Sequence, residues 1–256
     1  MDISLKTRQQ HCALHGDYES RAVTLGDTVL HWPGCVQCAA AAQAERAAAQ
    51  AVADAVARQH RLEARLQQTG IPLRYRNKTF ASFVADTDGK AVARAGAMAF
   101  AADFSRHRRD GSVLVLSGKP GTGKSHLAIA IGQQVMQRGT VLYTSAIDAV
   151  RMIRDTWRRD AERSESQVLR MLAAIDLLIL DEVGVQYGTD AEQITLFDII
   201  DKRYRDLMPT ILLTNLGTAD MKAFLGERSF DRLREGGVWL KFDWESQRGK
   251  QAMQTV

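Results

Sequence analysis

The chain has 256 residues, of which 45% are hydrophobic and 25% charged, and its formal net charge is +4. This composition is ordinary for a soluble globular protein of one or two domains, with enough chain to bury a core without a disulfide scaffold. The apolar runs are too short for a membrane span, and the polar N-terminus lacks the apolar core of a signal peptide, so we expect a cytoplasmic protein with no membrane partner.

The first 38 residues contain all three cysteines of the chain and show little periodic pattern. Three cysteines cannot all pair with one another, and a cytosolic chain would keep them reduced. With one histidine they form the series Cys-x2-His-x19-Cys-x2-Cys, which has the ligand spacing of a tetrahedral zinc site. The predicted zinc ligands are Cys12, His15, Cys35 and Cys38.

Zinc at this position would be structural, because four protein ligands leave no place for a substrate. It would supply folding energy that so short a segment cannot obtain from its own core. His11 and His31 compete with His15 for the fourth position. Three unconnected reduced cysteines are the alternative interpretation.

Residues 39–68 are rich in alanine, with Glu, Arg and Gln between, and contain no Gly or Pro. This predicts one helix of about 30 residues, which the Gly and Pro of segment 69–72 would end. The chain would then divide into an N-terminal module, residues 1–68, and a second domain, residues 69–256. The helix is either a solvated connection or packs on a partner through Val52, Val56, Leu62 and Leu66.

From residue 73 onward, helical and strand patterns alternate. Helices are expected at about 90–107, 124–137, 146–158, 165–174 and 191–206, with short ones within 218–235. Strands are expected at 113–117, 140–144, 176–180, 210–214 and 238–242. Buried strands that alternate with helices predict an α/β fold, in which a parallel sheet has helices on both faces.

The segment after the first of these strands matches the phosphate-loop pattern G-x-x-x-x-G-K-[ST] in full. Its glycines let backbone N–H groups turn toward a phosphate, the lysine reaches the terminal phosphates, and the serine hydroxyl binds Mg²⁺. The following helix directs its positive dipole end at the same anion. The expected contacts of ATP are Gly118, Lys119, Pro120, Gly121, Thr122, Gly123, Lys124, Ser125 and His126.

A second buried strand ends in an acidic pair, Asp181-Glu182. In a phosphate-loop site, Asp181 would hold Mg²⁺ through water, and Glu182 would polarise the attacking water. An adjacent Asp-Glu pair favours hydrolysis of the nucleotide over transfer of phosphate to a small metabolite. We therefore expect an ATPase.

Several segments together resemble the family of DnaC-type helicase loaders and IstB-type transposase helpers, within the AAA+ ATPases. They are TGIPLRYRNKTFASF, SGKPGTGKSHLA, DLLILDEVGVQ, LLTNL and LGERSFDRLREGG…WLKFDWES, and the match covers about residues 69–246. The resemblance implies an AAA+ core that assembles side by side. Because 14 residues follow Phe242, we expect no full C-terminal lid.

The same resemblance implies roles for three further residues. Asn215 resembles the first sensor of AAA+ proteins, which lies between the acidic pair and the γ-phosphate. Arg228 resembles the arginine finger that reaches the ATP of a neighbouring subunit, and Arg232 would be a second basic contact. Surface ion pairs are the alternative for both arginines.

Trp157, with two arginines after it, lies where DnaC-like loaders contact single-stranded DNA. A base stacked on its ring beside cations is the expected mode, and packing of Trp157 in the core is the alternative. The leading hypothesis is an ATP-dependent loader of a DnaB-type hexameric replicative helicase onto single-stranded DNA, released by hydrolysis. The alternatives are a transposase helper that acts on double-stranded DNA and a nucleotide-binding adaptor that hydrolyses almost nothing.

Overall fold

The computed structural model describes residues 3–26, 28–185 and 190–247, with backbone alone at 55, 58–63, 65 and 190. The chain forms two compact units, residues 1–63 and 64–256, so the division falls inside the long helix. Among the described helices, none has both the length and the hydropathy that crossing a membrane requires.

The N-terminal unit begins with a β-hairpin that the sequence analysis did not predict. Strands β1 (Ile3–Cys12) and β2 (Gly16–Leu25) pair antiparallel over ten residues each, and the short β3 (Thr28–Val29) adds to β2. The sequence shows little periodic pattern here, and no strand was predicted in this segment. Most of the hairpin's side chains are exposed, so it lacks the strong apolar alternation that marks a half-buried strand.

Helix α1 (Val36–Gln68) confirms the predicted alanine-rich helix and starts three residues earlier. Val52 and Val56 are exposed, whereas Leu66 is buried in the core of the second unit. The side chain of Leu62 lies outside the described residues. Gly70, with φ +70°, follows the end of the helix, as the stop signal predicted.

The second unit is built on a five-stranded sheet in which all neighbours are parallel. The spatial order is β5-β6-β7-β4-β8, so β7 lies between β6 and β4. The middle strands β4, β6 and β7 are apolar runs and almost fully buried, as strands covered on both faces must be. The strands are β4 (Val113–Gly118), β5 (Val141–Ser145), β6 (Leu177–Val183), β7 (Thr210–Thr214) and β8 (Gly237–Phe242).

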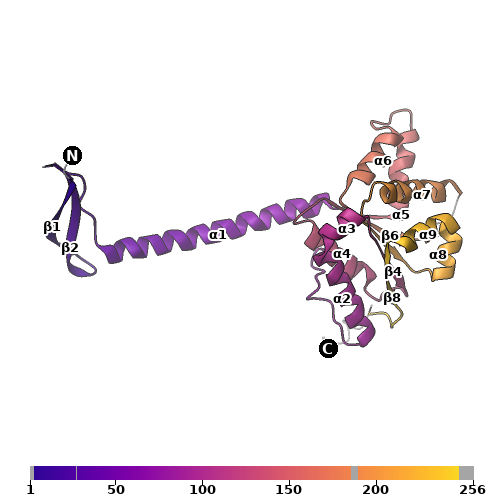
Figure 1. Ribbon diagram of the computed structural model, residues 1–256, viewed down its shortest axis with the longest axis horizontal. Coiled ribbons are helices and arrows are strands. Elements are labelled where there is room, and N and C mark those ends of the chain that lie inside the picture. Colours follow the sequence, from indigo (N-terminus) through magenta and orange to yellow (C-terminus); the bar gives the residue numbers. More distant parts are fainter. Residues whose placement is uncertain (1–2, 27, 186–189, 248–256) are drawn as a thin grey trace. The chain divides into compact units, whose positions relative to one another are not determined.

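Helices cover both faces of this sheet, each over its own apolar core (Figure 1). On one face lie α2 (Asp88–Ala102), α3 (Phe104–Asp110) and α4 (Lys124–Val135). The other face carries α5 (Ala146–Arg154), α6 (Glu165–Ala174), α7 (Asp190–Arg205), α8 (Thr218–Leu225) and α9 (Glu227–Glu235). The predicted α/β class, with its parallel sheet between two helical layers, is confirmed.

Local chemistry explains most element ends. The Ser145 hydroxyl accepts from the Asp148 N–H at the start of α5, and Ser164 forms a capping box with Gln167 at the start of α6. The helix predicted at 90–107 is two helices, because Asp103 (ψ 20°) interrupts it. The stretch predicted at 146–158 ends as a 3-10 turn, Asp155–Trp157, and a second such turn spans Leu73–Tyr75.

Candidate nucleotide site and metal cluster

The phosphate loop joins the end of β4 to the start of α4, in the strand–loop–helix context that a nucleotide site needs. Gly118 has φ +135°, and a Cβ there would overlap the carbonyl oxygen of Phe242. Gly123, with φ +98°, forms the cap before α4, and a Cβ there would approach the Phe83 ring to 2.7 Å. Both positions therefore demand glycine, which gives the loop its backbone-lined shape.

Lys124 is the buried cation of this loop. Its Nζ donates hydrogen bonds to the carbonyl oxygens of Gly118 and Lys119, at 2.7 Å each, and to Asn215 Oδ1 at 2.8 Å. Asn215 follows β7, the strand beside β4, so the strand order brings this amide to the phosphate loop. The structure thus brings together two residues predicted separately.

Asp181 and Glu182 lie at a break in the β6–β7 ladder, which shifts register between Leu180 and Val183. Asp181 Oδ2 accepts from the Ser125 hydroxyl at 2.9 Å, and Oδ1 accepts from the Glu182 N–H at 2.7 Å. Glu182 is exposed and has φ +60°, an uncommon backbone for a non-glycine residue that often marks functional sites. Ser125 and Asp181 thus offer an all-oxygen donor set, which suits Mg²⁺.

Tyr143, on the neighbouring strand β5, was missed by the sequence analysis. Its hydroxyl donates to Asp181 Oδ2 at 2.5 Å. Burial, followed by the negative charge of Asp181, raises the pKa of Tyr143, so the phenol stays protonated and a donor. The available signal in the sequence was a tyrosine near the end of a predicted strand, which can lie beside the strand that ends in Asp181.

His126, included among the nucleotide contacts, is packed against the segment that precedes the core helices. Its Nε2 lies 2.8 Å from the Thr79 carbonyl oxygen and 3.2 Å from the Ser82 hydroxyl, and its ring meets Phe83 edge-on. Burial lowers the pKa of His126 below its ordinary value. This residue fastens segment 79–83 to the helix of the phosphate loop.

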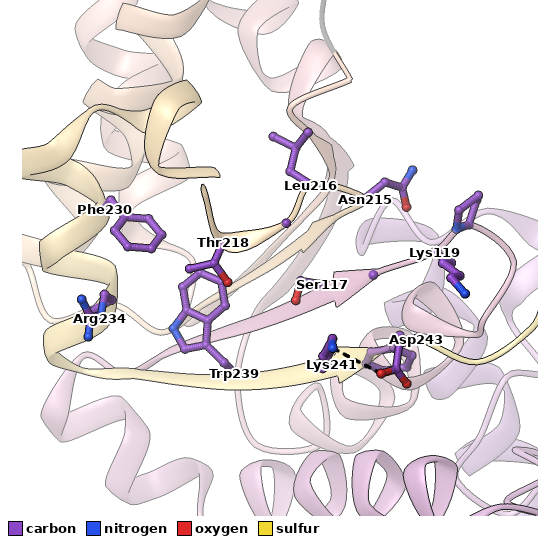
Figure 2. Close-up of a pocket in the computed structure, with 14 residues that line it drawn as sticks. Ser117, Lys119, Asn215, Leu216, Thr218, Phe230, Arg234, Trp239, Lys241 and Asp243 are labelled. Carbon is purple, nitrogen blue, oxygen red and sulfur yellow. Dashed lines mark ion pairs between the residues drawn. The ribbon is translucent and has the colours of Figure 1, made fainter. Parts of the chain in front are cut away.

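A cavity of about 910 Å³ borders the first half of the phosphate loop and the ends of β7 and β8. Figure 2 shows Lys119 and Asn215 on one side of it and Trp239 and Arg234 on the other. Lys241 also lines it and pairs with Asp243. The sequence analysis missed Arg234, Trp239, Lys241 and Asp243. The available signal was the strand β8, because a parallel neighbour of β4 ends at the same edge of the sheet as the phosphate loop.

The two arginines predicted to reach a neighbouring subunit lie on α9. Arg228, in its first turn, is exposed. Arg232 forms an ion pair with Asp201 and lies over the Tyr204 ring, with 5.5 Å from its Cζ to the ring centre. The structure therefore places Arg232 in an ion pair within its own chain and leaves Arg228 at the surface.

Trp157 is 58% exposed, and its Nε1 donates to Glu165 Oε2 at 2.8 Å. The alternative of a core tryptophan is wrong. Arg158 and Arg159, which follow it, are exposed as well. An accessible ring beside two cations fits the chemistry of nucleic-acid stacking sites.

In the N-terminal unit, the side chains of Cys12, His15, Cys35 and Cys38 converge, and their ligand atoms all lie within 4.8 Å of one another. The Cys12–Cys38 sulfur distance is 3.5 Å, and His15 Nδ1 lies 3.3–3.6 Å from the three sulfurs. Edges of about 3.5–3.8 Å are those of a tetrahedron around zinc. His11 instead bonds Asp17 at 2.6 Å, so His15 is the histidine of the cluster.

The close approach of these groups shifts the pKa values of two of the thiols in opposite directions. Hydrogen bonds from the Leu14 backbone and from His15 lower the pKa of Cys12 to about 6. The hydrogen bond to Cys12, together with burial and the charge of Cys12, raises the pKa of Cys38 to about 11. The residues present fit a Cys₃His zinc site.

Comparison with known proteins identifies the family. The model of the IstB-like ATP binding protein family matches residues 42–254. The chain belongs to this family. Among IstB-like relatives, the replicative helicase loader DnaC of Escherichia coli (strain K12) is 32% identical over 236 residues, which cover 90% of this chain and 89% of DnaC. Protein YdaV of the same organism is 37% identical over 193 residues, covering 75% of this chain and 76% of YdaV.

Solved structures agree on the fold of this IstB-like chain. A crystal structure of the DnaC helicase loader matches with a TM-score of 0.60 and 23% identity, over 67% of this chain and 99% of that one. The Aquifex aeolicus DnaA structure with AMPPCP matches with a TM-score of 0.57 and 22% identity, over 68% of this chain and 52% of that one. The second unit therefore has the fold of the DnaC helicase loader, and its sequence belongs to the IstB-like family.

Proposed function

We propose that this protein is an ATPase that loads a DnaB-type hexameric replicative helicase onto single-stranded DNA and is released by ATP hydrolysis. The observation that carries the proposal is a single hydrogen-bonded site, in which Lys124 bonds Asn215 and Ser125 bonds Asp181. This site stands in a chain that aligns with the DnaC loader over 90% of its length.

Each residue of the site has a role in the proposal. Backbone N–H groups of 118–125 and the Lys124 ammonium hold the phosphates, while Asn215 contacts the γ-phosphate. Ser125 and Asp181 would hold Mg²⁺, which would supply positive charge beside the phosphates. Glu182, exposed beside them, orients the attacking water.

Assembly would complete the site. We assign Arg228 as the arginine finger, because its exposed place on α9 leaves it available to a neighbouring subunit. Arg232 would join as a second contact only after its ion pair with Asp201 opens. Hydrolysis would then depend on side-by-side assembly.

DNA and helicase would bind at different places. Trp157 and the two arginines after it would hold single-stranded DNA by stacking and phosphate contacts. The zinc module and α1 would hold the helicase, with zinc on Cys12, His15, Cys35 and Cys38 as a structural ion. The tetrahedral spacing of the four ligand atoms supports this role for zinc.

The test mixes the full chain with the host replicative helicase, in ATP and in ADP, and follows complexes by native mass. We expect a complex of several copies per helicase hexamer in ATP, and its loss in Lys124→Ala, because the phosphates lose their buried cation. Lys222→Ala, which removes an exposed lysine of α8, is the matched control and should behave as wild type. If Lys124→Ala retains both ATP binding and helicase loading, the proposal is wrong.

A transposase helper is the second candidate, because the matching family model bears the IstB name. In that case the protein would bind double-stranded DNA and form filaments on it, with no helicase complex in either nucleotide. An ATP turnover assay with and without DNA separates both candidates from an adaptor, which would bind ATP with almost no hydrolysis.

A further inference from the structure

We propose that Tyr143 is a positioning residue for the magnesium site, which orients the Asp181 carboxylate through its hydroxyl. This inference rests on the proposed nucleotide site and deepens it. Tyr143 lies outside the phosphate loop and outside the acidic strand, so neither motif includes it.

Strand register places the tyrosine ring next to the carboxylate. Tyr143 on β5 stands opposite Ile179 on β6, and Asp181 follows two residues later. Because side chains alternate along a strand, all three lie on the same face of the sheet, the face covered by α4. Asp181 is the diagonal neighbour of Tyr143 on this face, and an aromatic side chain is long enough to reach it. Ser125, at the start of α4, donates to the same carboxylate from the helix that covers this face.

Three donors fix the Asp181 carboxylate. Oδ2 accepts from Tyr143 at 2.5 Å and from Ser125 at 2.9 Å, and Oδ1 accepts from the Glu182 N–H at 2.7 Å. Ser125 is itself an expected Mg²⁺ ligand, and Glu182 is the neighbouring residue in sequence. Tyr143 is therefore the side chain that can hold the carboxylate from outside the ligand set, as outer-shell partners do in other metal sites.

The main chain of Tyr143 is anchored in turn. Its N–H donates to the Thr69 carbonyl oxygen at 2.7 Å, which ties the edge strand β5 to the segment after α1. Gly70 has φ +70°, and a Cβ there would overlap the carbonyl oxygen of Tyr143. The close approach thus requires glycine, and it fixes the backbone from which the tyrosine ring extends.

The decisive experiment removes the hydroxyl and keeps the ring. Binding of a fluorescent ATP analogue to full-length Tyr143→Phe is titrated with Mg²⁺, and repeated with EDTA. We expect the Mg²⁺ concentration for half-maximal effect to rise about tenfold or more, within the range typical of lost outer-shell partners. Binding in EDTA should be unchanged. Tyr18→Phe, which removes a hydroxyl in the N-terminal unit, is the control.

A second variant tests the anchor. Gly70→Ala should shift the Mg²⁺ midpoint in the same direction, because the new Cβ displaces the Tyr143 backbone. A Mg²⁺ midpoint in Tyr143→Phe equal to or below that of wild type overturns the positioning role. Wild-type protein that binds no ATP analogue overturns the proposed nucleotide site itself, so the two failures are distinguishable.

Discussion

The two units of this chain obtain their stability in different ways. In the second unit, residues 64–256, which we call the ATPase unit, apolar side chains fill a core on each face of the sheet. In the described part of the N-terminal unit, only a few small side chains are buried, while Ile3 and Leu5 are 72% and 67% exposed. A segment this short and exposed cannot fold on apolar burial alone. The four converging side chains of Cys12, His15, Cys35 and Cys38 offer a metal site where a large apolar core is missing.

Removal of zinc is expected to have the largest effect and to act on one unit alone. A chelator, or Cys35→Ser, should unfold the hairpin, because structural zinc contributes about 10–16 kcal/mol in small zinc domains. The ATPase unit should keep its melting temperature. Zinc analysis and NMR of the hairpin amides, before and after chelation, measure the loss of the hairpin, and thermal unfolding of the ATPase unit measures its melting temperature.

His11→Ala is the matched control for this prediction, since His11 pairs with Asp17 outside the cluster. It should retain about one zinc per chain. A hairpin that persists without zinc would show that the unit has a stability source of its own, and the comparison would fail.

The next effect concerns a polar anchor inside the ATPase unit. Arg203 is fully buried, and its guanidinium donates to the carbonyl oxygens of Leu172, Ile175 and Pro209 and to the Thr210 hydroxyl. Arg203→Met should cost about 3–5 kcal/mol, because it leaves several buried acceptors without donors. The melting temperature of the ATPase unit should fall by roughly 6–20 °C.

Arg205→Met, two residues on in the same helix, removes an exposed arginine and should change the melting temperature little. Zinc content should be the same in both variants. Equal melting temperatures for the two variants would mean that Arg203 is not an anchor of this unit.

The smallest expected effect appears in acid and again separates the units. Burial would raise the pKa of Asp176, but hydrogen bonds from Thr140 and Arg108 outweigh it and lower that pKa below its ordinary value. A lowered native pKa stabilises the fold above about pH 4, and this stability is lost as the pH falls further. The stability that the unit loses in acid should therefore be smaller in Asp176→Asn than in wild type. The difference should be less than about 1 kcal/mol, because the Asp176 carboxylate is partly exposed.

Acid denaturation, followed separately in each unit, shows which unit unfolds first as the pH falls. Protons compete with zinc for the cysteines and histidine, so the N-terminal unit should lose its structure first. An ATPase unit that unfolds at a higher pH than the hairpin would contradict the prediction.

The comparison of units also shows where sequence patterns suffice. Most elements of the ATPase unit were predictable, because its middle strands are continuous apolar runs and the helices α2, α5 and α6 have side-chain N-caps. The phosphate loop and the acidic strand end were predictable because one phosphate site requires those residue types at those spacings. The hairpin was not, since β1 is exposed along most of its length and the buried face of β2 carries Ser20, Ala22 and Thr24 in place of large apolar residues.

By itself, the sequence determined the α/β class, the phosphate loop and the set of metal-ligand candidates, because each depends on local spacing along the chain. Only the tertiary structure decided that His15 rather than His11 completes the cluster, and that Tyr143 bonds Asp181. It also decided that Arg203 is buried and that Arg232 pairs with Asp201. These outcomes depend on contacts between distant segments, which strand order and register set and local patterns do not encode.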